Sequence, residues 1–148
     1  MSQESDVSEE DPSVTRVAKA YAEAVAARDI DAFIRLYDPS VRVFDAWGVW
    51  SYEGIAAWRV AIANWFASDP NERLKVTFDE VTVVSSPAFA SMTAMVTYAM
   101  VSAQGEPKNS IRNRLTWVID TSGPLPRIIH EHTSVPVRFE DGKAILQS

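Results

Sequence analysis

Two histidines near the end of the chain are the side chains best suited to chemistry at neutral pH, because imidazole titrates in that range. His130 and His132 stand two positions apart in RIIHEHTSVP, a stretch whose composition is typical of a β-strand. Alternate residues of a strand point to the same face, so Ile128, both imidazoles and Ser134 are predicted to form one row. Glu131 is then predicted to point the other way, toward a subunit contact or solvent.

Three interpretations of the histidine pair are open. With a third ligand such as Asp45, two imidazoles on one face could bind a metal ion and support a metal-assisted hydrolase. The chain contains two histidines and no cysteine, so no metal site is assigned. The pair could instead hydrogen-bond to a ligand in a pocket, or could consist of core groups whose partners lie within the protein.

Asp45 lies in DAWGVWSYEG, a cluster that also contains Trp47, Trp50 and Tyr52. Aromatic residues at this density in a short connection are typical of a segment that lines or covers a pocket. A dry setting would raise the pKa of the carboxyl toward the range useful to a general base. The alternative is a solvated loop aspartate or a helix cap.

Two arginines, Arg112 and Arg114, are spaced so that they share one face of a predicted strand. Arg114 and Thr116 could meet the histidine row from the neighbouring strand. The alternative is a pair of surface arginines.

The elements that must position these residues are three helices followed by a sheet. Helical spacing of apolar residues predicts a first helix from an Asp11 cap to about Arg28, a second, short one that ends at Pro39, and a third between Gly54 and Asp69. Alternation of apolar and polar residues predicts five strands. They are 41–44, the stretch from Leu74 to a turn at 85–87, 89–102, 111–120 and 127–137. This order predicts an α+β fold, in which a strongly curved, mainly antiparallel sheet wraps the helices.

Composition limits the function classes. The chain has 148 residues and a net charge of −6, and 5 of its 20 acidic residues fall within 1–11, where there is no basic residue. The rest is nearly neutral, which disfavours nucleic-acid binding. We predict an acidic disordered lead-in (1–12), one domain (13–138) and a tail (139–148) that forms an Asp-Gly turn or frays. The absence of a signal-peptide pattern and of a membrane-spanning run predicts a cytoplasmic protein without a membrane partner.

Two stretches resemble a known superfamily. YAEAVAARDIDAFIRLYDPSVRVFDAWGVWSYEG, from Tyr21 to Gly54, resembles the ketosteroid isomerase pattern of a helix tyrosine, a G/R-D-x-D helix junction and an aspartate before a glycine-closed loop. IIHEHTSVPV resembles the terminal motif of many SnoaL-like proteins. Over most of 14–137 the chain is similar to the SnoaL-like branch of the nuclear transport factor 2-like superfamily, which includes polyketide cyclases and is related to ketosteroid isomerases.

The resemblance implies a cone-shaped α+β barrel (a cystatin-like roll), an apolar pocket at its wide end and a homodimer formed through the sheet. It also implies residue roles. Tyr21 matches the isomerase tyrosine that hydrogen-bonds the substrate oxygen, and Asp45 matches the general base. The isomerase's second oxyanion donor, a protonated aspartic acid, corresponds to the strand IRNRLTWV, which offers Asn113 or Arg114 instead. Arg114 could also pair with Asp45.

The resulting hypothesis is a cofactor-independent isomerase, cyclase or lyase that acts on a small apolar or carbonyl-containing molecule. Asp45 removes a proton beside a carbonyl, Tyr21 and Arg114 polarise its oxygen, and His130 or His132 shuttles a proton or orients the substrate. A non-catalytic ligand-binding or dimerisation module is the alternative. Side chains predicted to contact the ligand are Trp47, Trp50, Trp58, Arg114, Thr116 and Ser134.

Overall fold

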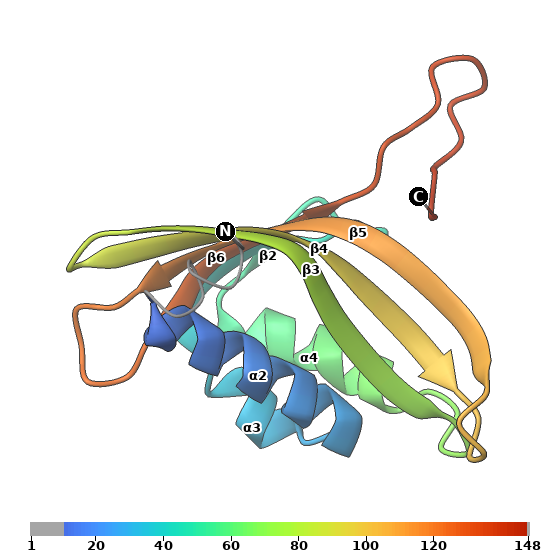
Figure 1. Cartoon of the computed structure of the whole chain (residues 1–148), viewed down its shortest axis with the longest axis horizontal. Coiled ribbons are helices and arrows are strands. Elements are labelled where there is room, and N and C mark those ends of the chain that lie inside the picture. Colours follow the sequence, from blue (N-terminus) through green and yellow to red (C-terminus); the bar gives the residue numbers. More distant parts are fainter. Residues whose placement is uncertain (1–10, 148) are drawn as a thin grey trace, which may run out of the picture.

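The computed structural model describes residues 11–147, which form one six-stranded sheet curved around three helices (Figure 1). The elements in chain order are α2 (Pro12–Ala27), α3 (Ile30–Ile34), β1 (Tyr37–Phe44), β2 (Tyr52–Glu53), α4 (Ile55–Phe66), β3 (Arg73–Ser85), β4 (Phe89–Val101), β5 (Pro107–Asp120) and β6 (Arg127–Ser134). The predicted α+β fold, with three helices inside a curved, mainly antiparallel sheet, is confirmed.

The first helix begins where capping chemistry predicts. The side chain of Asp11 accepts a hydrogen bond from the backbone N–H of Val14 at 3.3 Å, and Pro12 occupies the first turn. Apart from Asp11 and Pro12, which belong to the start of α2, the predicted lead-in 1–12 lies outside the described residues.

The second helix ends earlier than predicted. Its last residue is Ile34, and Tyr37, which we placed in the helix, already belongs to β1. The backbone of Ile128 donates to Leu36 at 2.8 Å and pairs with Tyr37, so β6 recruits these residues into the sheet. Pro39 therefore lies within a strand, in the part of β1 where the pairing with β6 is irregular.

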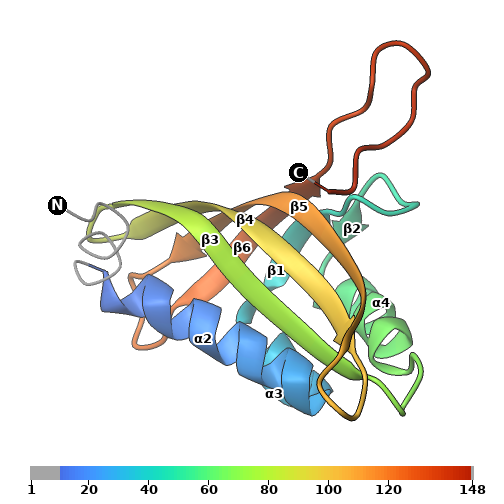
Figure 2. The same ribbon diagram turned by 45° about the vertical axis from the view of Figure 1, so that its right-hand side comes forward.

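The strand order is β2-β1-β6-β5-β4-β3. Strands β3 to β6 form an antiparallel meander, whereas β1 pairs with β6 in parallel. The turned view shows the long strands bending across the helices (Figure 2). The side of the sheet that faces the helices is called the inner face below, and the opposite side the outer face.

A β-bulge in β6 changes which residues face inward. Val118 pairs with His130, but the next residue, Ile119, pairs with Ile128, so Ile129 is an extra residue without a partner in β5. One extra residue reverses the alternation of a strand. Ile128 and Glu131 consequently both lie buried on the inner face.

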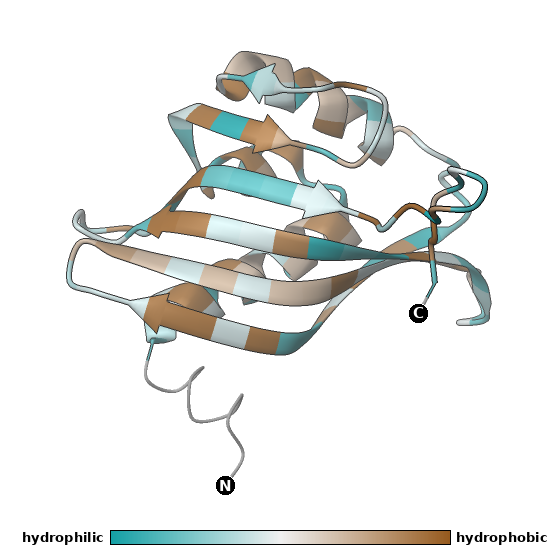
Figure 3. Ribbon diagram, turned by 90° about the horizontal axis from the view of Figure 1, so that it is seen from above, coloured by the Kyte–Doolittle hydropathy of each residue, from teal (hydrophilic) through white to brown (hydrophobic). Residues whose placement is uncertain are grey.

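The outer face carries the alternate, more polar residues of each strand. Figure 3 looks onto this face and shows hydrophilic and hydrophobic residues alternating along the strands. Beyond β6, the tail forms a hairpin that stands away from the sheet, with a turn at Asp141-Gly142 and a bridge between Val137 and Ala144 (Figure 1). None of the described helices is long and apolar enough to span a membrane.

Arg28 joins the end of α2 to the loop that follows α4. Its backbone adopts a left-handed conformation with φ of 52°, which ends the helix. Its guanidinium donates at 2.6–2.9 Å to four backbone carbonyl oxygens, those of Phe66, Ser68, Asp69 and Glu72. Such a multiple contact uses the fixed fork of donors that lysine lacks.

Replacing Arg28 by Lys should therefore lower the free energy of unfolding by roughly 2 kcal/mol, because several charge-assisted hydrogen bonds are lost. Urea unfolding monitored by circular dichroism measures the change. Arg59→Lys is the matched control, since the contact of Arg59 within the described part of the chain is an exposed ion pair with Asp31, worth less than about 1 kcal/mol. Equal losses in the two variants would contradict the role assigned to Arg28.

Candidate functional site

A cavity of about 430 Å³ lies between α2, α4 and the inner face of the sheet. Its polar groups include two carboxyl groups, Asp45 and Glu131, and its described lining residues include no Lys, Arg or His. Six of its lining residues are aromatic, namely Tyr21, Trp47, Tyr52, Trp58, Trp65 and Tyr98. A cavity of this size and composition is typical of a small-molecule site.

Asp45 follows directly after β1 and is held at the cavity wall by Thr133 of β6. The hydroxyl of Thr133 donates to Asp45 Oδ1 at 3.1 Å and accepts from the backbone N–H of Ala46 at 3.0 Å. Burial raises the pKa of Asp45, and hydrogen bonds from Thr133 and from the backbone of Trp47 and Ala46 offset part of that rise. The carboxylate is thus fixed in position and more basic than a solvated one.

A buried tyrosine, Tyr21, and a partly buried one, Tyr98, meet in the cavity. The hydroxyl oxygens of Tyr21, from α2, and Tyr98, from β4, are 3.0 Å apart. Burial raises the pKa of both hydroxyls, so both stay protonated at neutral pH. Only one proton can lie between two hydroxyls, which leaves the other proton free to bind an oxygen of a ligand.

Glu131 is the most deeply buried carboxyl of the site, with 1% of its surface exposed. Its Oε1 accepts hydrogen bonds from the Tyr37 hydroxyl at 2.6 Å and from the Trp117 indole N–H at 2.9 Å. Burial raises the pKa of Glu131 to about 7; the two hydrogen bonds lower it, and the charge of Asp45 raises it. The prediction that Glu131 points away from the pocket is wrong, because the bulge at Ile129 turns this side chain inward.

Two buried polar atoms of the lining have no hydrogen-bond partner among residues 11–147. They are Asn113 Oδ1 on β5 and Trp58 Nε1 on α4. Buried polar groups in folded proteins are almost always paired, so each of these atoms marks a place for a water molecule or a polar group of a ligand.

The structure brings together four of the predicted site residues, Tyr21, Asp45, Trp47 and Trp58, around one cavity. Trp50 lies elsewhere. Its side chain is 97% exposed and borders a second, open hollow on the outside, together with Phe44, Asp45 and His132.

The predicted pocket wall of Ile128, His130, His132 and Ser134 is wrong, since only Ile128 faces inward. The bulge at Ile129 places both histidines and Ser134 on the outer face. There His130 Nδ1 lies 2.7 Å from the carbonyl oxygen of Arg42, and the two imidazoles flank the Phe44 ring with centroids 5.0 and 5.4 Å away.

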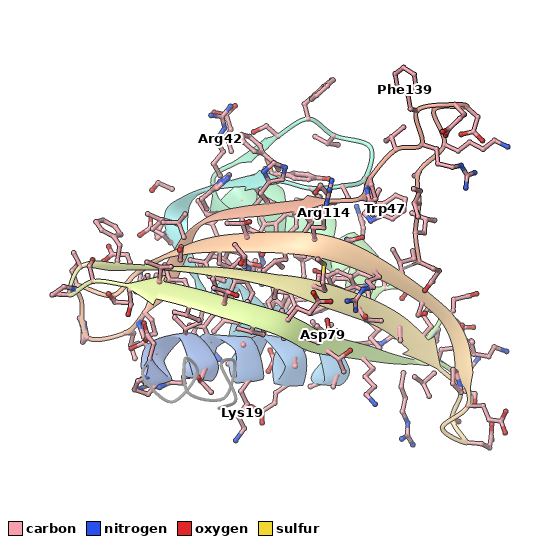
Figure 4. The ribbon with its side chains drawn as sticks, turned by 45° about the horizontal axis from the view of Figure 1, so that its top comes forward. Lys19, Arg42, Trp47, Asp79, Arg114 and Phe139 are labelled. Atoms are coloured by element: carbon pink, nitrogen blue, oxygen red, sulfur yellow. The ribbon has the colours of Figure 1, made fainter. Side chains whose placement is uncertain are left out.

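Arg114 and Thr116 do meet the histidine row, as their spacing predicts. Arg114 pairs with Ser134, and Thr116 pairs with His132. This row lies on the outer face, however, so these residues do not line the cavity. The Nε of Arg114 donates to Ser134 Oγ at 3.0 Å, and Figure 4 shows Arg114 on the side of the sheet away from the helices. Asn113, the other predicted alternative on this strand, is the residue that faces inward.

No group of three or more His, Cys, Asp or Glu residues within 11–147 could hold a metal ion. The imidazoles of His130 and His132 have centroids 6.3 Å apart, and Asp45 lies at the cavity wall with its carboxylate bound to Thr133.

A family model for the SnoaL-like domain matches residues 14–138. The chain belongs to the SnoaL-like family. The predicted resemblance is thereby confirmed, and the family supports a domain that binds small molecules.

Solved structures show that this SnoaL-like domain has the nuclear transport factor 2-like fold. An NTF2-like protein of unknown function from Pseudomonas putida has a TM-score of 0.82 and 20% identity, covering 95% of this chain and 96% of that one. A cystatin-like protein from Caulobacter vibrioides has a TM-score of 0.66 and 17% identity, covering 84% and 88%. The association domain of CaMKII from C. elegans has a TM-score of 0.69 and 18% identity, covering 87% and 98%. No curated protein matches the chain.

The pKa of Glu131 makes stability depend on pH. Because the folded-state pKa is raised from 4.5 to about 7, the stability that comes from the protonated carboxyl is fully present below about pH 4.5 and is lost as pH rises through 7. At about 1.4 kcal/mol per pH unit, wild type should lose roughly 3 kcal/mol relative to Glu131→Gln over this interval.

Urea unfolding of wild type and Glu131→Gln on either side of this interval measures the difference. Glu140→Gln, in the exposed tail hairpin, removes the same charge and serves as the control. Parallel pH profiles for wild type and Glu131→Gln would show that Glu131 ionises normally.

Proposed function

We propose that the cavity binds a small carbonyl compound and that Asp45 removes a proton from the carbon next to the carbonyl group. The observation that supports this proposal best is the position of Asp45. Its carboxylate has a raised pKa, is held by Thr133, and lies at the wall of an aromatic cavity with no Lys, Arg or His in its described lining. A partly buried carboxylate with an increased pKa is a suitable general base.

Tyr21 and Tyr98 supply the complementary group. When Asp45 takes the proton, the electron pair of the C–H bond forms a C=C bond and negative charge develops on the carbonyl oxygen. A buried hydroxyl that donates a hydrogen bond to this oxygen stabilises the charge where it forms. The 3.0 Å contact between Tyr21 and Tyr98, which both line the cavity, supports this role for the free proton of the pair.

The reaction class follows from the fate of this intermediate. Returning the proton to a different carbon gives an isomerase, expelling a neighbouring group gives a lyase, and attack on a second carbonyl of the same molecule gives a cyclase. Each route moves protons and electron pairs within the substrate and requires no electron acceptor.

Association between copies is the second candidate function. The tail hairpin stands away from the sheet and presents Phe139 with 100% of its side chain exposed and Val137 with 61% (Figure 4). Large apolar side chains in such a position favour a contact with another molecule. The similarity to the association domain of CaMKII supports association between copies. The contact we propose is a homodimer formed through the sheet and this hairpin.

Replacing Asp45 by Asn should abolish proton abstraction while leaving ligand binding intact, since the amide oxygen still accepts the hydrogen bond from Thr133. The assay is exchange of the α-hydrogens of uncharged cyclic ketones, beginning with 2-tetralone, in D₂O, followed by proton NMR. The exchange rate should fall by about 10²–10⁴-fold, the usual contribution of a general base.

Asp120→Asn is the control, because the carboxylate of Asp120, the last residue of β5, accepts its hydrogen bonds from Ser122 in the following turn and does not line the cavity. Its exchange rate should equal that of wild type. Unchanged exchange in Asp45→Asn, or no acceleration by wild type with any ketone of the series, would refute the catalytic assignment.

Replacing Phe139 by Ser should weaken self-association, because the substitution removes the most exposed apolar ring of the hairpin. Sedimentation velocity over a range of protein concentrations measures the dimer fraction. Lys143→Ser alters the same hairpin without removing apolar surface and should leave that fraction unchanged. A wild-type protein that stays monomeric at every concentration would refute the association.

A further inference from the structure

The two oxygens of Glu131 have different surroundings. Oε1 accepts from both Tyr37 and Trp117, at 2.6 and 2.9 Å. Oε2 has no hydrogen bond to any residue within 11–147, and the side chain lines the cavity. The carboxyl therefore has one oxygen occupied by the protein and one oxygen available to a ligand.

This difference between the two oxygens determines which of them carries the proton when Glu131 is neutral. An oxygen that already accepts two hydrogen bonds is a poor site for a proton, so protonated Glu131 carries its hydrogen on Oε2. Burial raises the pKa of the group to about 7, and the carboxyl is consequently neutral on the acidic side of that pH. A neutral carboxyl with its O–H toward the cavity is a hydrogen-bond donor.

Among residues 11–147, Asp45 is the other charged group that acts on Glu131. Neighbouring elements direct toward it the hydroxyls of Tyr21, Tyr37 and Tyr98, the indole of Trp117 and, at longer range, the carboxylate of Asp45. Because Asp45 is also acidic, the two carboxyl groups disfavour simultaneous ionisation.

We propose that Glu131 is the acid of this site, donating a hydrogen bond from Oε2 to the oxygen of an uncharged carbonyl ligand, while Asn113 Oδ1 accepts one from a hydroxyl or N–H of the same ligand. The pairing of Glu131 with Asp45 as acid and base rests on the proposed function. The binding roles of Glu131 and Asn113 do not.

The proton balance is simple. Asp45 takes one proton from carbon, the carbonyl π electrons move onto oxygen, and Glu131 hydrogen-bonds to that oxygen or transfers its proton to give the enol. The reverse transfers, with Asp45 returning its proton to a different carbon, restore both carboxyl groups. Two carboxyl groups with different burial thus take opposite roles, Asp45 as base and Glu131 as acid.

Charge limits the class of ligand. The described lining includes no cationic side chain to neutralise a ligand carboxylate or phosphate, and Asp45 already contributes negative charge. Placing a second, unpaired anion in a partly buried cavity is unfavourable. Asn113, which is 3% exposed and whose Oδ1 lacks a partner, adds the requirement for a donor group. The ligand class is therefore an uncharged carbonyl compound that carries a hydroxyl or an N–H, for which cyclic ketones serve as probes.

Ligand binding at different pH values tests the role of Glu131 without requiring catalysis. The probes are 2-tetralone and its monohydroxy isomers, and quenching of tryptophan fluorescence reports binding, because Trp47, Trp58 and Trp65 line the cavity. The affinity of wild type should be constant in acid and fall up to about tenfold per pH unit above pH 7, as the Oε2 proton is lost. Glu131→Gln keeps a donor at this position and should bind equally at both ends of the range.

Tyr37→Phe provides a second variant if the glutamine protein does not fold. It removes a hydrogen bond that lowers the pKa of Glu131, so the midpoint of the binding profile should move to higher pH. Asn113→Leu tests the acceptor. At least one hydroxytetralone should bind wild type more tightly than 2-tetralone does, and this advantage should disappear in Asn113→Leu.

Each contrary result is decisive. Affinity that is independent of pH in wild type, or that increases with pH, would overturn the role of Glu131 as donor. Failure of every ketone to bind would overturn the ligand class, and an equal hydroxyl advantage in Asn113→Leu would overturn the role of Asn113. Normal pH-dependent binding without hydrogen exchange would instead refute the base role of Asp45 and leave this inference standing.

Discussion

The buried carboxyl of Glu131 is the constraint on which much of this structure depends. It lies on β6, between β1 and β5, and each neighbouring strand supplies one donor, Tyr37 from β1 and Trp117 from β5. Burying a carboxyl without such partners is strongly unfavourable. A slip in either strand pairing would separate the carboxyl from a donor, so this group specifies the register of both the parallel and the antiparallel pair.

The same constraint gives the cavity its electrostatic character. Polar groups of the site are set into an aromatic wall, where hydrogen bonds and charges act more strongly than in water. Asp45 lies nearer to solvent than Glu131, and Thr133 holds it in place through a single hydroxyl. Burial raises the pKa of both carboxyl groups, to about 7 for the more deeply buried Glu131, and the described lining of the cavity contains no cationic side chain that would oppose this rise.

The fold and half of the site could be predicted from the sequence. The other half could not, because it depends on a local irregularity in β6. Tyr21 and Asp45 could be recognised because helical spacing and the position after a strand are visible in the residue order. Glu131 could not be found, because its direction depends on the bulge at Ile129, and Ile128-Ile129 is an ordinary apolar pair in a strand. The same bulge places both histidines outside. The end of α3 was misjudged because pairing with β6 extends β1 back to Tyr37.

The C-terminal end of the tail returns to the sheet and covers part of the edge of β5. β6 ends at Ser134, whereas β5 extends from Pro107, so the first part of β5 would present unpaired backbone groups on one side. Residues near the C-terminus occupy this side, with Arg112 N–H donating to the Leu146 carbonyl and the Gln147 side chain donating to Ser110. An open strand edge invites the addition of a strand from another molecule. The chain thus covers part of the exposed edge of β5 against amyloid-like strand addition.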